Sequence, residues 1–227
     1  MNTHSHEEKK HHKSPAPLWA ESFSIQHAFS TAWEMFSKNW QLFLVIQLAT
    51  SLTLFTATFL SERVLEGTFA RLFADVLKLG LQLIIGLGLM FVYLRVYDGE
   101  ETKPLDMFDP LPLFWGYAGV VILFVLGVGL GLILLIVPGI ILAAGWSLAH
   151  YIVIETNSSP VDALKESWKR TEGHKFNIAL FAAIACALNL VGMLAFGIGL
   201  LITLPLTGLA YAHIYRFFFP KKNEVIL

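Results

Sequence analysis

Long apolar stretches alternate with short polar segments along most of the chain. Apolar runs cover about residues 40–60, 79–97, 176–196 and 199–219, and a longer run covers about 113–155. A helix needs about 20 apolar residues to cross the hydrocarbon core of a bilayer, and the longest run suits two such helices. The pattern therefore predicts six transmembrane helices.

Two positions could hold the turn inside the longest run. The Pro138-Gly139 pair favours spans of about 113–137 and 138–155, because proline is tolerated in the first turn of a helix but disrupts its interior. The alternative is a break among three closely spaced glycines, Gly127, Gly129 and Gly131.

Three further segments are amphipathic. They cover about 24–38, 62–78 and 160–172, and apolar residues recur in them every three or four positions, as on one face of a helix. Such helices are too polar to cross a bilayer but suit its headgroup region. Because lipid offers the backbone no hydrogen-bond partners, the spans themselves must be helical. The predicted fold is all-α: a polytopic membrane helix bundle of six transmembrane helices plus interfacial amphipathic helices.

The polar flanks predict how the chain is oriented. Residues 1–22 are expected to form a disordered cytoplasmic tail, 23–219 a single membrane domain, and 220–227 a cytoplasmic C-terminal tail. Thirteen Lys and Arg residues fall on the side of both tails, and three fall on the other side: Arg63, Arg71 and Lys78. Since Lys and Arg are enriched in cytoplasmic segments, both termini are predicted to be cytoplasmic.

The composition agrees with a membrane protein and argues against several other classes. The chain is 56% hydrophobic and 15% charged, with a mean hydropathy of +0.63, whereas soluble domains are about 25% charged. Its net charge of −1 argues against a nucleic-acid binder. The single cysteine, Cys186, gives neither a disulfide framework nor a thiolate metal site.

Four polar residues within the spans are candidate functional residues: Gln47, His150, Asn189 and His213. His150 and His213 could relay protons or bind one metal ion, but contact with the interface or a neighbouring helix is the favoured interpretation. Asn189 could bond across helices, which is favoured, or line a cavity. No nucleophile–base pair or carboxylate cluster stands out, so we expect no enzyme and no catalytic, cofactor-binding or metal site.

Four tryptophans, Trp33, Trp40, Trp115 and Trp168, lie near predicted span ends, where the amphipathic indole ring suits the membrane interface. Small residues four apart, at Gly127 and Gly131 and at Ala195 and Gly199, permit close helix contacts. Membrane lipids are the expected partners, together with a second copy of the chain or another membrane protein at these contacts.

Residues 28–33 and 163–168 resemble each other, since each begins with Ala, ends with Trp and lies six residues before Asn39 or His174 and a span. This similarity suggests a parallel repeat. With Ile136-Val137-Pro138-Gly139-Ile140, Gly173, Gly197-Ile198-Gly199 and Leu204-Pro205, the second copy resembles uncharacterised bacterial six-span proteins. That group is similar to the membrane domain associated with glycerophosphodiester phosphodiesterases.

The resemblance implies the fold and a bacterial cytoplasmic membrane, and it covers about residues 23–219. The phosphodiesterase barrel has no counterpart in the chain, so the resemblance implies no such activity. Two functions remain as expectations. The first is a non-enzymatic, lipid-interacting, scaffold or accessory protein, and the alternative is a small transporter or exporter of an apolar or amphiphilic solute.

Overall fold

The computed structural model describes residues 24–63, 67–195 and 197–221. The predicted tail over 1–22 and most of the predicted C-terminal tail lie outside these residues. Every regular element in the described part of the chain is helical. The elements are α1 (Ile25–Arg63), α2 (Thr68–Tyr97), η2 (Pro104–Phe108), η3 (Leu111–Leu113), α3 (Phe114–Leu134), α4 (Ile136–Trp146), α5 (Ala149–Thr156), α6 (Pro160–Arg170), α7 (Lys175–Leu194) and α8 (Leu200–Phe218).

Within the described residues, five helical stretches are long and apolar enough to cross a membrane: Ile25–Arg63, Thr68–Tyr97, Pro104–Leu134, Ile136–Thr156 and Lys175–Leu194. Helix α8 has 19 residues but carries His213 and Arg216 in its second half, which lowers its hydropathy. The protein is thus an all-α, multi-pass membrane helix bundle, and the predicted count of six spans is approximate.

Helix α1 joins two elements that the sequence pattern separated. The predicted interfacial helix over 24–38 and span over 40–60 are one helix with a kink at Asn39, where φ is −118° and ψ is 20°. The Asn39 side-chain amide donates a hydrogen bond to the carbonyl of Met35 at 3.0 Å. A side chain that competes for the backbone carbonyls can bend a helix without ending it, so the predicted boundary between the two elements is a bend within one helix.

Helix α2 also corrects a predicted boundary. The amphipathic segment over 62–78 was expected to lie apart from the span over 79–97, but a single helix runs from Thr68 to Tyr97. Residues 78 and 79 are Lys and Leu, both good helix formers, so nothing there stops the helix. The change from polar to apolar residues near Lys78 therefore does not interrupt the helix.

The turn in the longest apolar run lies at Leu135, which has extended backbone angles of φ −156° and ψ 127°. This is three residues before the favoured Pro138-Gly139 pair and beyond the alternative glycines. Pro138 instead occupies the third position of α4, where its missing N–H group removes no helical bond. The predicted fourth span over 138–155 is further divided into α4 and α5.

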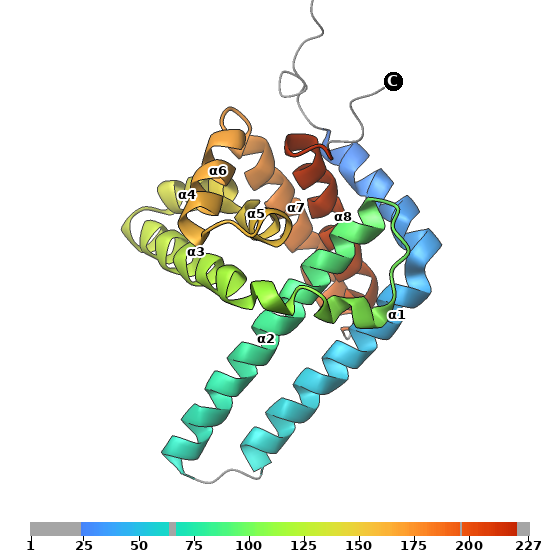
Figure 1. The fold of residues 1–227 in the computed structure, drawn as a ribbon, viewed down its shortest axis with the longest axis vertical. Coiled ribbons are helices and arrows are strands. Elements are labelled where there is room, and N and C mark those ends of the chain that lie inside the picture. Colours follow the sequence, from blue (N-terminus) through green and yellow to red (C-terminus); the bar gives the residue numbers. More distant parts are fainter. Residues whose placement is uncertain (1–23, 64–66, 196, 222–227) are drawn as a thin grey trace, which may run out of the picture.

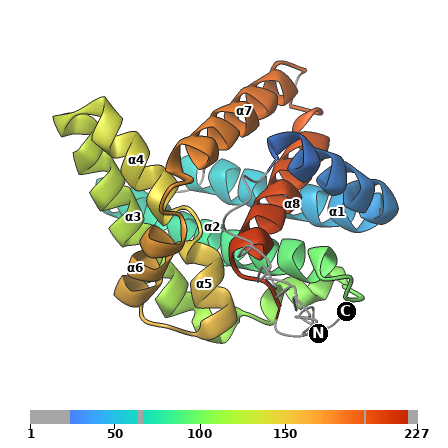
Figure 2. The ribbon, with the colours of Figure 1, turned by 90° about the horizontal axis from the view of Figure 1, so that it is seen from above.

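Three antiparallel hairpins build the molecule: α1–α2, α3–α4 and α7–α8. Helix α8 lies at the centre and packs against α1, α2 and α7, and the view from above shows the other helices around it (Figures 1 and 2). The α1–α2 hairpin extends well beyond the rest of the bundle (Figure 1). Large side chains fill the centre, with Phe43, Tyr151, Phe181 and Tyr215 almost fully buried.

Helix α6 begins as its sequence predicts. The Ser159 hydroxyl accepts a hydrogen bond from the backbone N–H of Asp162, and Pro160 occupies the first helical position. The buried hydroxyl of Ser167 donates to the carbonyl of Gly145 at 2.7 Å, which fastens α6 to α4. The amphipathic helix is therefore fixed to the membrane hairpin beside it.

The two segments of the suggested repeat share one backbone feature. His174 precedes α7 with φ −117° and ψ 1°, close to the angles of Asn39 at the kink of α1. The connections differ, because the amphipathic and apolar parts of α1 form one bent helix, whereas α6 ends at Arg170 and a turn over residues 171–174 precedes α7. The common ancestry of the two segments stays a hypothesis.

Candidate functional site

A cavity of about 410 Å³, open to the outside on one side, lies between α1, α2, α3, α5 and α8, and we call it the central cavity. Most of its wall is apolar. The polar groups that line it come from different helices: Gln47, Tyr93, Ser147, His150, Tyr151, Thr207 and Tyr211. A mainly apolar cavity with a few convergent hydrogen-bonding groups is typical of small-molecule sites in proteins.

Two of the four candidate polar residues, Gln47 and His150, meet at this cavity. The His150 ring makes edge contacts with the rings of Tyr117 and Phe124, at centroid distances of 5.8 and 5.2 Å. Contact with the interface or a neighbouring helix was the favoured interpretation for His150, and the ring both contacts α3 and borders the cavity. The Ser147 hydroxyl donates to the carbonyl of Ala144, so it is not bonded to the imidazole.

His213 lies elsewhere, in the C-terminal half of α8. Its Nδ1 is 3.0 Å from the hydroxyl of Tyr97, and its ring centroid is 5.3 Å from that of His27. It is not among the residues that line the cavity. His150 and His213 therefore belong to separate clusters rather than to one shared metal site.

Asn189 lies behind the wall of the cavity. Its side-chain amide donates to the Thr207 hydroxyl at 3.4 Å, which links α7 to α8. The carbonyl oxygen of the same amide and the hydroxyl of Thr203 are buried without a partner among the described atoms. Asn189 thus bonds across helices, the favoured of its two interpretations, and reaches the cavity only through Thr207.

A charged cluster joins the ends of α2, α5 and α8. The Arg216 guanidinium donates two hydrogen bonds to Asp98, at 2.8 and 2.7 Å, and a third to Glu155 at 2.7 Å. The side chains of Arg216 and Asp98 are only 8% and 7% exposed. Two parallel bonds between a guanidinium and a carboxylate make the pair strong and directional. We call Asp98, Glu155 and Arg216 the charged clamp.

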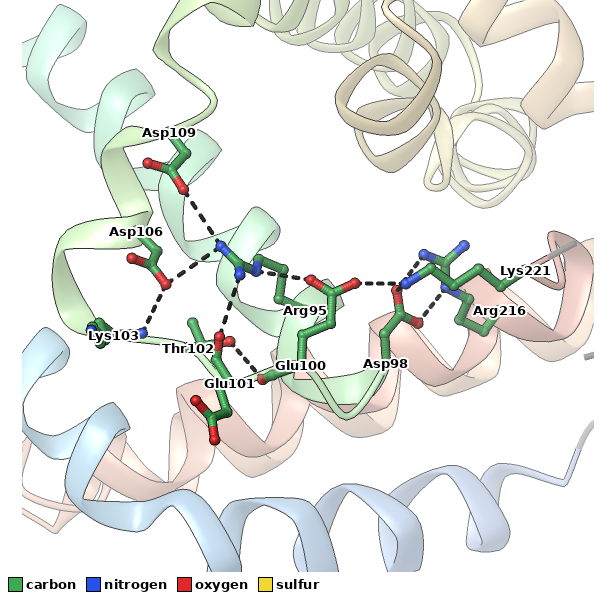
Figure 3. Close-up of polar contacts among 10 residues, drawn as sticks. All are labelled: Arg95, Asp98, Glu100, Glu101, Thr102, Lys103, Asp106, Asp109, Arg216 and Lys221. Atoms are coloured by element: carbon green, nitrogen blue, oxygen red, sulfur yellow. Dashed lines mark hydrogen bonds and ion pairs between the residues drawn. The ribbon is translucent and has the colours of Figure 1, made fainter. Parts of the chain in front are cut away.

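Further ion pairs surround the clamp (Figure 3). The Lys221 ammonium is 3.0 Å from Asp98 and 2.7 Å from Glu100. The hydrogen bond from Lys221 lowers the pKa of the Glu100 carboxyl, and the same bond raises the pKa of Lys221. Arg95 contacts Glu100 and also reaches two aspartates of the segment between α2 and α3, Asp106 and Asp109. This segment and the end of α8 are thereby fixed to the end of α2.

The charged clamp lies next to the cavity. Tyr215 donates a hydrogen bond to Glu155, and its ring stacks on that of Tyr151 with a centroid distance of 5.2 Å. Tyr151 in turn lines the cavity. One layer of aromatic side chains therefore separates the clamp from the cavity and closes this side of it.

The polarity pattern of single spans did not predict the clamp. Its three residues lie at the ends of the second, fourth and sixth predicted spans, far from the span centres where charges were sought. A signal was nevertheless present. In a chain with alternating orientation, the even-numbered spans all end on one side of the membrane, and there Asp98 and Glu155 could meet Arg216.

The four candidate interface tryptophans all lie at the surface. Trp33, Trp40, Trp115 and Trp168 are exposed by 55%, 49%, 82% and 36%. Of these, Trp168 carries a cation on its ring face, since the Lys175 ammonium is 3.2 Å from the ring centroid. Such exposure of large aromatic rings fits contact with lipid, and their depth in a membrane stays a prediction.

The small residues four apart are used within the chain. Gly131 packs against Gly139, and Gly127 faces the Trp146 ring, so α3 and α4 cross closely. Gly199 likewise lies against Gly192 at the α7–α8 turn. Only Ala195 of the predicted set is exposed. A contact with a second chain through these residues stays a prediction. Gly127, Gly131 and Gly199 already pack against other residues of the same chain.

Part of the chain is similar to a bacterial membrane protein. The chain is 32% identical over 109 residues to a UPF0259 membrane protein of Pectobacterium carotovorum subsp. carotovorum (strain PC1), and the match covers 48% of this chain and 41% of the relative. No protein-family model matches the chain. No solved structure matches it either. The chain is therefore weakly homologous, over less than half of either sequence, to a membrane protein, which agrees with its apolar helices and a multi-pass membrane location.

Proposed function

We propose that the protein is a non-catalytic membrane protein whose central cavity holds an uncharged amphiphilic molecule. The observation that carries this proposal is the cavity of about 410 Å³ where α1, α2, α3, α5 and α8 meet. Ligand sites of about 300–1,000 Å³ commonly combine an apolar wall with few polar groups. The cavity falls at the lower end of this range, which suits a small or medium-chain amphiphile.

The cavity wall indicates the chemistry of the occupant. Among the described residues that line it, none is Asp, Glu, Lys or Arg, so a charged group would lose its hydration without gaining an ion pair. Gln47, Thr207 and Tyr211 offer hydrogen-bonding groups from two helices. A hydroxyl, ester or amide group could bond to them while a hydrocarbon portion fills the apolar part.

The absence of a paired nucleophile at the cavity supports a binding role. The Ser147 hydroxyl is bonded to a backbone carbonyl, and the His150 Nδ1 lies 3.5 Å from the Ser147 carbonyl. A serine activated by histidine would need the hydroxyl itself bonded to the ring. We therefore propose retention of an amphiphile, in an accessory or lipid-responsive role, rather than its chemical conversion.

A small transporter or exporter of an apolar or amphiphilic solute is the second candidate. It is favoured by the polar pair of Asn189 and Thr207, which continues from the cavity wall toward α7. The charged clamp argues for retention, because Asp98 and Arg216 would have to separate before a solute could pass on that side. Efflux of a bound probe from proteoliposomes would favour transport over retention.

We also propose the bacterial cytoplasmic membrane as the location, with both termini in the cytoplasm. The asymmetry of thirteen against three Lys and Arg residues supports this orientation. In a C186A background, a membrane-impermeant maleimide added to intact spheroplasts should label the variant G197C but not the variant G99C. Labelling of position 99 alone would mean that the orientation is the reverse of the proposed one.

The predicted relation to membrane domains associated with glycerophosphodiester phosphodiesterases stays a hypothesis.

Filling the cavity should abolish binding of a small amphiphile. Leu204 lines the cavity from α8, and L204W places an indole ring in the space. We expect this variant to bind monocaprin, an uncharged medium-chain monoacylglycerol, at least about tenfold more weakly than the unaltered protein. Native mass spectrometry of the purified full-length protein, titrated with monocaprin in mild detergent, measures the effect.

The matched control is I202W, two residues away on the same helix. Ile202 is 45% exposed and does not line the cavity, so a larger ring there should contact detergent and leave monocaprin binding unchanged. Equal binding by L204W and I202W would mean that the amphiphile associates with the outer surface, and the cavity would lose its proposed role.

A further inference from the structure

A second cavity lies on a different part of the molecule, where α6 ends, α7 begins and α8 ends. Its volume is about 590 Å³, and it shares no lining residue with the central cavity. Its wall carries one acidic residue, Glu172, and is otherwise mainly basic and aromatic, with Lys169, Arg170, His174, Phe217, Phe218 and Pro220.

The basic groups of this second cavity have unused hydrogen-bonding capacity. Lys169 is exposed and forms no ion pair or side-chain hydrogen bond with another described residue. Arg170 donates through Nε to Glu166 at 2.8 Å, and its two terminal nitrogens have no partner among the described residues. A planar guanidinium beside a free ammonium is an arrangement suited to the oxygens of a phosphate group.

An aromatic ring holds the Arg170 side chain in place. The Arg170 guanidinium lies over the Phe219 ring at 5.1 Å from its centroid. His174 makes an edge contact with Phe218 at 5.4 Å. Both contacts tie the turn between α6 and α7 to the end of α8, so the Arg170 guanidinium is presented by a fixed wall rather than by a separate loop.

The position of the cavity places it at the boundary of a membrane. Helix α7 enters the apolar part of the bundle at Lys175, and α8 leaves it at Phe218. Directly after the cavity, α7 exposes Phe176, Leu180 and Ile184, which lie four residues apart and are 79%, 45% and 40% exposed. Residues four apart share one face of a helix, so an apolar stripe leads away from the basic cavity.

From this combination, we infer that the second cavity binds the phosphate headgroup of an anionic phospholipid, whose acyl chains lie along Phe176, Leu180 and Ile184. Basic pockets between transmembrane helices are suited to such headgroups because they pair with the phosphate at the depth where lipid presents it. A soluble phosphate compound would use the cations but not the apolar stripe. This inference is independent of the occupant of the central cavity.

Removing the two cations should remove the preference for anionic lipid. The variant K169Q/R170Q keeps the length and polarity of both side chains but not their charge. Native mass spectrometry of the full-length protein, titrated separately with phosphatidylglycerol and phosphatidylcholine, should show about tenfold tighter binding of phosphatidylglycerol by the unaltered protein and near-equal binding by the variant. The conservative variant K169R/R170K should retain the preference.

Two controls make the result specific. K38Q/K103Q removes two exposed cations elsewhere in the chain and should keep the preference for phosphatidylglycerol. Inorganic phosphate at a concentration equal to that of the lipid should not displace phosphatidylglycerol, because it lacks the acyl chains. Equal binding of both lipids by the unaltered protein, an undiminished preference in K169Q/R170Q or full displacement by inorganic phosphate would each overturn the assignment.

Discussion

Replacing Arg216 by leucine should lower the free energy of unfolding by about 3–5 kcal/mol, the usual cost of removing one partner from a buried ion pair. The substitution leaves Asp98, with its side chain 7% exposed, facing an apolar side chain and paired only with Lys221. It also leaves Glu155 without its hydrogen bond from the guanidinium. Reversible unfolding in mixed detergent micelles, followed by circular dichroism, measures the loss.

A double-mutant cycle separates the ion pair from the volume change. D98N/R216L removes both charges of the main pair, so its destabilisation should be smaller than the sum for D98N and R216L. K38L, which breaks the exposed pair of Lys38 and Glu34, should leave the unfolding curve unchanged. Strict additivity within the cycle would mean that the charged clamp does not stabilise the bundle.

The second large effect is expected at the crossing of α3 and α4. A Cβ atom on Gly139 would lie 2.6 Å from the backbone nitrogen of Leu132, which cannot move without displacing α3. G139V should therefore destabilise the protein by about 1–3 kcal/mol, as overpacking of a close contact does, or prevent the hairpin from closing. The same unfolding assay detects the first outcome, and loss of monodisperse protein in gel filtration detects the second.

Gly129 gives a matched control in the same hairpin. A Cβ atom there would meet no atom within 4 Å. G129V makes the same chemical change in an apolar helix and should leave stability within error of the unaltered protein. If the two valine variants behaved alike, the close approach of α3 and α4 would not depend on small residues.

Hydropathy alone predicted the class of fold because a long apolar segment in lipid must form a helix. Without water to bond to, the backbone of such a segment must form its own hydrogen bonds. The positions of the element ends were less predictable. Asn39 bends α1 without ending it, and α2 continues through the change in polarity at Lys78. Hydropathy describes the surroundings of a residue, whereas a helix ends where its backbone bonds are interrupted.

The candidate site was predicted in part for a similar reason. Gln47 and His150 were recognised because a polar group within an apolar span is unusual, and both border the central cavity. Asn189 was recognised in the same way but bonds to Thr207 instead. The cavity itself depends on how five helices cross. That arrangement is a property of tertiary packing, which periodicity along one segment does not contain.

The charged clamp shows what a search of single segments overlooks. Each of Asp98, Glu155 and Arg216 appeared as an ordinary polar flank at the end of its own span. Their buried pairing becomes visible only when the ends of α2, α5 and α8 are placed together. The clamp holds Tyr215 in the aromatic layer that closes one side of the cavity, so under the proposed function it connects the stability of the bundle to the retention of an occupant.

The most direct test of this account is an experimental density map of the full-length protein in nanodiscs made from native bacterial membrane. We expect elongated density between α1, α2 and α8, with one end near Gln47 and Thr207 and the remainder along the apolar wall. The clamp of Asp98, Glu155 and Arg216 should be closed above it. A cavity filled by the rearranged rings of Tyr93 and Tyr211, with no space for another molecule, would contradict the proposed function.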